Sequence, residues 1–81
     1  MNINVRLFAI AKELAECEIL QVNVSEPCTV DELRRAIAQQ SPAIAPIVAQ
    51  LMIAVDEEYA TGATVIGPRA TVACIPPVSG G

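Results

Sequence analysis

TVDELRRAIAQQ, residues 29–40, is the stretch that decides the fold. Thr29 and Glu32 stand three residues apart at its start, the spacing of a capping box in which each side chain bonds the other residue's backbone amide. The acidic residues of the first turn lie at the positive end of the helix dipole. Apolar residues then recur at helical spacing until Ser41-Pro42 interrupts them. The stretch therefore predicts a helix from Val30 to Gln40 with one apolar face.

Strand patterns precede this helix. Residues 2–7 alternate strictly between polar and apolar, which is the period of a half-buried strand. Residues 19–24 predict a second strand, with Leu20, Val22 and Val24 on one face and Gln21 and Asn23 on the other. Residues 9–14 between them are good helix formers and predict one or two helical turns. The short gap between the two strands suits an antiparallel pair.

The part of the chain after the helix predicts shorter elements. Proline at position 46 limits residues 43–50 to a short helical piece. Residues 52–55 predict a short buried strand, followed by a polar turn at Asp56-Glu57-Glu58. The glycine-punctuated residues 62–68 are expected to form a loop.

Residues 71–75 carry no charge on either face, as expected of a central strand buried on both sides. The first and last strands are expected to be parallel neighbours, with the helix of residues 30–40 across one face. This order predicts an α+β fold, a β-grasp (ubiquitin-like) roll with a mixed sheet and one main helix packed across it.

Composition excludes several classes of function. The 81 residues suffice for one small domain, 53% of them are hydrophobic, and the net charge is −4. The five basic residues are spread thinly, so no nucleic acid partner is expected. The three cysteines lack paired spacing and there is no histidine, so we expect neither a metal site nor disulfides, and reduced thiols in the cytoplasm. No apolar run approaches the length of a membrane span.

The end of the chain carries the candidate functional site. Residues 1–75 are expected to form the domain and residues 76–81 a flexible C-terminal tail. Pro76-Pro77 ends the last strand and gives the tail a stiff root, and the final Gly80-Gly81 leaves its tip without side chains. Such a tail can extend roughly 20 Å. A carboxylate at its tip suits activation as an acyl-adenylate by a partner enzyme, although a bare Gly-Gly terminus is also compatible with simple fraying.

Several short motifs connect this chain to a known family. They are Val5-Arg6-Leu7-Phe8-Ala9, Ala11-Lys12-Glu13-Leu14, Thr29-Val30-Asp31-Glu32-Leu33, Ala54-Val55-Asp56 and the terminal Pro76-Pro77-Val78-Ser79-Gly80-Gly81. Over its whole length the chain resembles the MoaD family, the small subunits of molybdopterin synthase, which are ubiquitin-like sulfur carriers. Members of that family commonly carry an aromatic residue just before Pro-Pro, where Cys74 and Ile75 stand here.

The resemblance implies a cycle with two partners and no bound cofactor. An adenylating enzyme (MoeB-like) would use ATP to activate the carboxylate of Gly81, which is then converted to a thiocarboxylate. The large subunit of molybdopterin synthase (MoaE-like) would accept the sulfur onto a pterin precursor and supply the catalytic groups, so this chain is not itself an enzyme.

The resemblance also implies roles for individual residues. Gly81 would carry the sulfur and Gly80 would give clearance in a narrow channel. Four residues would guide the tail: Pro76, Pro77, Val78 and Ser79. Phe8 would lie on the partner-binding surface together with Ile75, although plain core remains the other interpretation of Phe8.

Other reactive residues have simpler structural interpretations. A sulfur relay at Cys74 is less favoured than an inert core cysteine, and Asp56-Glu57-Glu58 is interpreted as a solvated turn. Four basic residues are expected on solvated faces, namely Arg6, Lys12, Arg34 and Arg35. Three alternatives to the molybdopterin role remain: a sulfur carrier for thiamine, cysteine or tRNA thiolation, a ubiquitin-like protein modifier, and a plain interaction domain.

Overall fold

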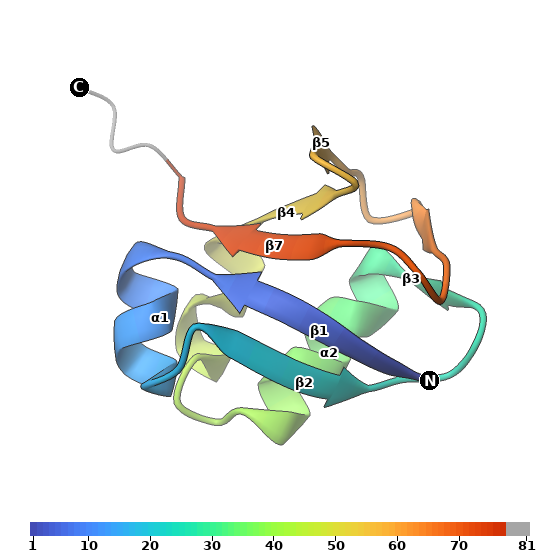
Figure 1. Ribbon diagram of the computed structural model, residues 1–81. Coiled ribbons are helices and arrows are strands. Elements are labelled where there is room, and N and C mark those ends of the chain that lie inside the picture. Colours follow the sequence, from blue (N-terminus) through green and yellow to red (C-terminus); the bar gives the residue numbers. More distant parts are fainter. Residues whose placement is uncertain (78–81) are drawn as a thin grey trace.

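The computed structural model describes residues 1–77. Its main feature is a five-stranded sheet in the order β2-β1-β7-β4-β5, seen face-on in Figure 1. The strands are β1 (Asn2–Leu7), β2 (Ile19–Asn23), β7 (Val72–Ile75), β4 (Met52–Val55) and β5 (Glu58–Tyr59). β1 and β7 are parallel, and the other neighbours are antiparallel. The prediction that the first and last strands are parallel neighbours is therefore confirmed.

The long helix α2 (Val30–Gln40) crosses the rear face of the sheet and has the predicted bounds. Its capping box is complete: Glu32 N donates to Thr29 Oγ1 at 3.2 Å, and Thr29 N donates to Glu32 Oε1 at 2.8 Å. The hydroxyl of Thr29 also donates to Oε1, at 3.1 Å, and the bonds that the Thr29 amide and hydroxyl donate lower the pKa of the Glu32 carboxyl. Two shorter helices complete the fold, α1 (Ala9–Ala15) and the 3₁₀ helix η1 (Ala45–Gln50).

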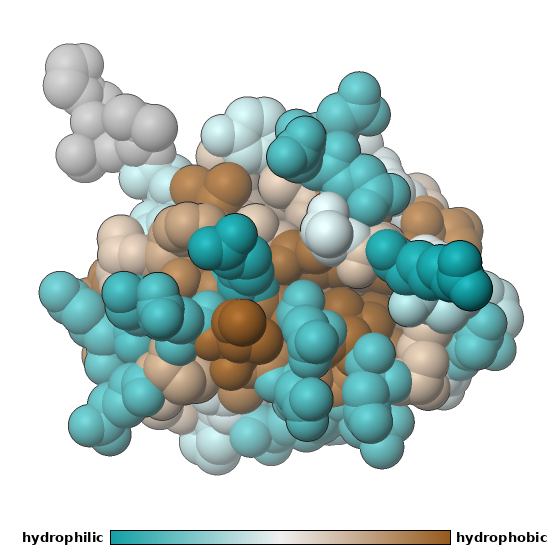
Figure 2. Space-filling model, in the orientation of Figure 1, coloured by the Kyte–Doolittle hydropathy of each residue, from teal (hydrophilic) through white to brown (hydrophobic). Residues whose placement is uncertain are grey.

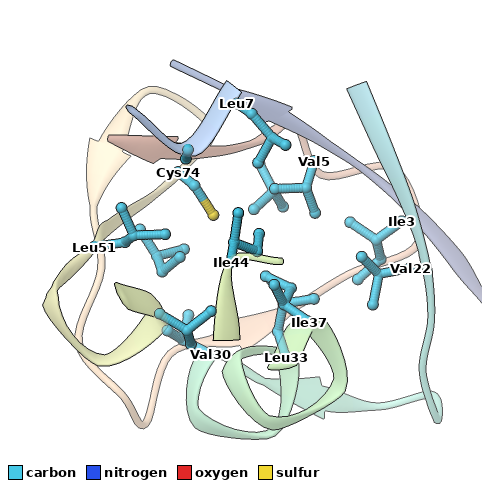
Figure 3. Packing of buried hydrophobic residues seen from close by; sticks show 14 of the residues in the cluster. Ile3, Val5, Leu7, Val22, Val30, Leu33, Ile37, Ile44, Leu51 and Cys74 are labelled. Carbon is cyan, nitrogen blue, oxygen red and sulfur yellow. The ribbon is translucent and has the colours of Figure 1, made fainter. Parts of the chain in front are cut away.

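The core lies between the sheet and α2. Alternate residues of β1 point inward and meet the apolar face of α2, as Figure 3 shows for Val5 and Ile37. The side chain of Cys74 reaches into the same cluster from β7 and is fully buried. The strict alternation of residues 2–7 thus corresponds to one buried and one exposed face, as the sequence predicts.

The free edge of β2 is partly covered by a side chain of α2. Gln40 Oε1 accepts from Asn23 N at 3.0 Å, and Gln40 Nε2 donates to Asn23 O at 2.8 Å. The primary amide therefore pairs with the backbone of Asn23 as a neighbouring strand would.

Three short strands were not expected from the sequence. Glu58 belongs to β5 and not to the turn, which consists of Asp56 and Glu57 alone, with φ of 51° and 69°. Positive φ at both positions is the geometry of a two-residue hairpin turn. β6 (Val65–Ile66) pairs with β3 (Cys28–Thr29) where a loop was predicted. Strands of two residues are too short to show alternation, so only their pairing partners define them.

The expectation that β7 is buried on both faces is wrong. Val72 and Cys74 are buried against the core, whereas Ala73 and Ile75 are only half-buried on the opposite face. Among residues 1–77 no helix covers that outer face of the sheet. The lack of charge in β7 therefore reflects an apolar outer surface as well as its place in the middle of the sheet. Nor does any helix in this described range have the length and apolar character to cross a membrane.

Arg34 does not lie on a solvated face, contrary to the prediction. It is half-buried, and its Nη1 donates to the carbonyl oxygens of Val48 at 2.8 Å and Leu51 at 2.7 Å. These bonds join α2 to the end of η1 and to the residue before β4. The sequence hides this role because the two acceptors are backbone atoms more than a dozen residues away.

We expect Arg34→Ala to lower the free energy of unfolding by at least about 1.5–3 kcal/mol, the value of one hydrogen bond from a charged donor, because the substitution removes two such bonds. The adjacent Arg35 is exposed, so Arg35→Ala is the matched control and should change the free energy by less than about 0.5 kcal/mol. Urea unfolding of both variants measures the difference. Equal losses of unfolding free energy in the two variants would show that Arg34 acts only through its charge or its helix propensity, and not through the two hydrogen bonds.

Candidate functional site

The outer face of the sheet carries an apolar surface beside the root of the tail. Residues paired in register point to the same side of a sheet, and the register places Ala73 between Arg6 and Ala54, and Ile75 beside Met52. Tyr59 of β5 pairs with Ala54 and continues the row. Phe8 directly follows β1, as Pro76 follows β7. We call this surface the outer apolar patch; its members are Phe8, Met52, Ala54, Tyr59, Ala73 and Ile75.

Large apolar side chains of the patch are exposed. Phe8 is 40% exposed, Met52 37% and Tyr59 65%. Figure 2 shows this face, with apolar surface visible between polar side chains. An open hollow of about 430 Å³ is lined by Phe8, Tyr59 and Ile75, with Arg6 and Glu57 also at its wall. Exposed aromatic and aliphatic side chains around a hollow are typical of a protein-binding surface.

The far end of the outer face is polar. The outward residues of β1 and β2 at the far end are all amides, namely Asn2, Asn4, Gln21 and Asn23. The apolar character is therefore confined to the end of the sheet at which β7 stops and the tail begins. A partner that docks on the patch would have the tail at the border of the interface.

Four of the predicted site residues lie within the described range, and four lie outside it. Phe8 is exposed and Ile75 is half-buried, and both line the hollow. Pro76 is half-buried and Pro77 exposed. The remaining predicted residues lie outside the described range, so their roles stay predictions: Val78, Ser79, Gly80 and Gly81.

Sequence reasoning missed Tyr59 and Met52 as members of the surface. The two-residue turn at Asp56-Glu57 places Tyr59 opposite Ala54. The three-residue turn predicted from the sequence did not define the face of the sheet on which Tyr59 lies. The usable signal was the two-residue period of any strand, which places Met52 and Ala54 of β4 on one face. Tyr59 supplies an exposed aromatic ring to the surface.

Cys74 is a core residue, as its uncharged strand predicts. Its side chain is fully buried, and burial raises the pKa of its thiol to about 11. Burial also raises the pKa of the Cys28 thiol, with a smaller contribution from Glu32. Thiols that stay protonated are poor nucleophiles, so neither cysteine is suited to carry sulfur. All three cysteines are free, and the described residues contain no cluster of three metal-ligating side chains.

A pH titration tests the environment of Cys74. From pH 9.0 to about 11 the unfolded chain loses the thiol proton while the folded chain keeps it. The folded state then binds more protons, so stability falls as pH rises through this range. We expect urea unfolding of the wild type to show this loss, and Cys74→Val, which has no thiol, to show less of it. If stability fell equally steeply with pH in the two proteins, the raised pKa assigned to the Cys74 thiol would be contradicted.

Comparisons with known proteins agree with this architecture. The profile of the ThiS family matches residues 5–81. A molybdopterin synthase sulfur carrier subunit of Arabidopsis thaliana is 30% identical over 81 residues, covering 100% of this chain and 84% of that protein. Among solved structures, small archaeal modifier protein 1 (SAMP1) of Haloferax volcanii superposes with a TM-score of 0.87 at 25% identity, covering 100% of both chains.

A third comparison concerns an assembly. A chain from the complex of subunits 1 and 2 of the molybdopterin-converting factor of Helicobacter pylori aligns over 100% of both chains with a TM-score of 0.68 and 23% identity. These structures share the mixed sheet and crossing helix of this chain. The predicted β-grasp (ubiquitin-like) fold is thereby confirmed.

Proposed function

Because the chain belongs to the ThiS family, we propose that it is a sulfur carrier and the small subunit of a molybdopterin synthase. The relative from Arabidopsis thaliana, itself a molybdopterin synthase sulfur carrier subunit, supports this pathway. In this proposal residues 1–75 are the domain, and residues 76–81 are the flexible tail that carries the reactive group at Gly81.

The observation that carries the proposal is the outer apolar patch at the root of the tail. Phe8 and Ile75 line its hollow, and the chain passes from Ile75 directly into Pro76-Pro77. A partner that covers the patch buries apolar area at about 25 cal/mol per Å² and receives the tail at the edge of the same contact. Docking and delivery of the tail tip are therefore coupled by the covalent chain.

The chemistry proceeds at the terminal carboxylate. A carboxylate oxygen of Gly81 attacks the α-phosphorus of ATP on an adenylating partner (MoeB-like), and pyrophosphate leaves. Sulfide sulfur, supplied by a donor protein or small thiol system, then attacks the acyl carbon and AMP leaves, which produces the thiocarboxylate. Gly80, with no side chain, permits close approach of the partner's backbone, and Pro76 through Ser79 guide the tail.

The accepting partner is the large subunit (MoaE-like), which holds the pterin precursor and the catalytic groups. The complex of subunits 1 and 2 from Helicobacter pylori supports a partner of this kind. This chain then needs no bound cofactor, and ATP is consumed on the adenylating enzyme. The fully buried Cys74 is consistent with sulfur being held at the tail and not on a side chain. We place the cycle in the cytoplasm.

One incubation tests the proposal. The protein is mixed with the adenylating enzyme of its cell, ATP and a sulfur source, and its intact mass is measured. We expect a gain equal to the exchange of one oxygen for sulfur, located at Gly81 by fragmentation, and conversion of a pterin precursor to a dithiolene when the large subunit is added. An unchanged mass with an active adenylating enzyme would contradict the carrier role.

A protein-modifier role is the second candidate, and the similarity to SAMP1 favours it. In that case the activated carbonyl of Gly81 would be attacked by lysine amines of other proteins. The same incubation in a cell extract separates the two roles, because conjugates of higher mass that contain Gly81 amides indicate a modifier. A carrier for thiamine, cysteine or tRNA thiolation would load sulfur but fail to transfer it in the presence of the large subunit.

A further inference from the structure

Arg6 occupies a distinctive position on the outer face of the sheet. It projects from β1 between Ile19 of β2 and Ala73 of β7, both of which are apolar. Its guanidinium carbon lies 5.6 Å from the centroid of the Phe8 ring, within the range of a cation–π contact. The charged group is therefore set among the residues that a docking partner covers.

The charge of Arg6 has no counter-charge within the described part of the chain. Across residues 1–77 the only ion pair joins Lys12 to Glu18, and no described hydrogen bond comes from the Arg6 side chain, in contrast to that of Arg34. Glu57 also borders the hollow but makes no ion pair with Arg6. In the free protein this guanidinium is exposed and hydrated.

Docking changes the energetics of this group. A partner that seals the hollow removes water from Arg6, and burial of an unpaired charge costs several kcal/mol. Arginine keeps its proton in proteins, so the cost cannot be avoided by neutralisation. A stable complex on this surface therefore requires an anionic group on the partner, and the planar fork of a guanidinium fits a carboxylate with two parallel hydrogen bonds.

We propose that Arg6 is a specificity-determining residue of the interface, and that the large subunit presents a carboxylate to it beside an apolar side chain that fills the hollow. The proposal rests on the proposed function and adds the chemistry of the partner's contact surface. Phe8 contributes twice, because its exposed ring is part of the hollow and also holds the guanidinium in place. Because the net charge of this chain is −4, a single positive group on the docking surface favours a partner with a carboxylate at that position over partners without one.

The test compares three variants in binding to the large subunit. Arg6→Leu keeps an apolar stem but leaves the partner's carboxylate buried and unpaired, so affinity should fall at least about 30-fold. The affinity of Arg6→Glu for the large subunit should fall further, by about 1000-fold, because two negative charges then face each other across the interface. Arg69→Glu is the matched control, since Arg69 is exposed and lies outside the residues that line the hollow, and it should change affinity less than about 3-fold.

The outcomes separate this inference from the proposed function. Binding of Arg6→Leu as tight as that of the wild type would overturn the carboxylate contact while leaving the carrier role intact. Equal losses in Arg6→Glu and Arg69→Glu would also overturn it, because only net charge would then matter. Failure of the wild type to bind the large subunit or to load sulfur would instead contradict the proposed function. Thermal unfolding of each variant confirms that the fold is retained.

Discussion

Removal of Gly81 is expected to abolish sulfur loading while leaving the stability of the domain unchanged. The truncated chain still ends in a carboxylate, on Gly80, but this group lies one residue, about 3.5 Å, short of the position that the partner's active site engages. Misplacement of a reacting atom by even about 1 Å can cost on the order of 100-fold in rate. A displacement of a full residue should therefore leave no detectable thiocarboxylate.

The stability of the truncated protein can be predicted from the core. The buried apolar residues described extend from Ile3 to Cys74, so loss of Gly81 should change the free energy of unfolding by less than about 0.5 kcal/mol. Intact mass after incubation with the adenylating enzyme, ATP and a sulfur source measures loading, and urea unfolding measures stability. Arg69→Ala, at an exposed residue outside the tail and the outer apolar patch, is a control that retains the tail length and should load. Normal loading of the truncated chain would show that the terminal position is not the reactive one.

Substitution of Phe8 by Asp is expected to weaken binding to the large subunit by about 100-fold or more, since aromatic residues at the centre of interfaces contribute 2–4 kcal/mol. The change removes an exposed ring from the outer apolar patch, places a carboxylate at the hollow and deprives Arg6 of its aromatic contact. Isothermal titration calorimetry with the purified large subunit measures the loss.

The matched control for Phe8 is Ile10. Its side chain is 43% exposed, close to the 40% of Phe8, but it lies on α1 and does not line the hollow. Ile10→Asp should therefore bind within about 3-fold of the wild type. If both substitutions weakened binding equally, the docking surface would have to extend over α1, and the position assigned to it would be wrong.

Local interactions made the main helix predictable. The capping box of Thr29 and Glu32 and the break at Ser41-Pro42 act within a few residues, and α2 has the predicted bounds. The alternation of residues 2–7 similarly identified which side chains of β1 are buried. Each of these signals is complete within one segment, so no knowledge of the rest of the fold was needed.

Contacts between distant segments escaped prediction. β3 and β6 are two residues each and exist only because Cys28 pairs with Ile66. The role of Arg34 depends on two backbone carbonyls that the fold brings to it. Part of the candidate site could be predicted from the sequence, since Phe8 and Ile75 do lie on one surface. Tyr59 joins them only through the register of β4 and β5. The tail residues 78–81 were identified from composition and resemblance alone.

The amide of Gln40 has a consequence for the behaviour of the protein at high concentration. In the proposed cycle the chain is free between its two partners, and a bare sheet edge would then template the addition of strands from other copies. On β2 the backbone of Asn23 is already occupied by Gln40, which shortens the segment available for edge-to-edge growth. We therefore expect this side chain to limit edge-to-edge association of the free protein at high concentration.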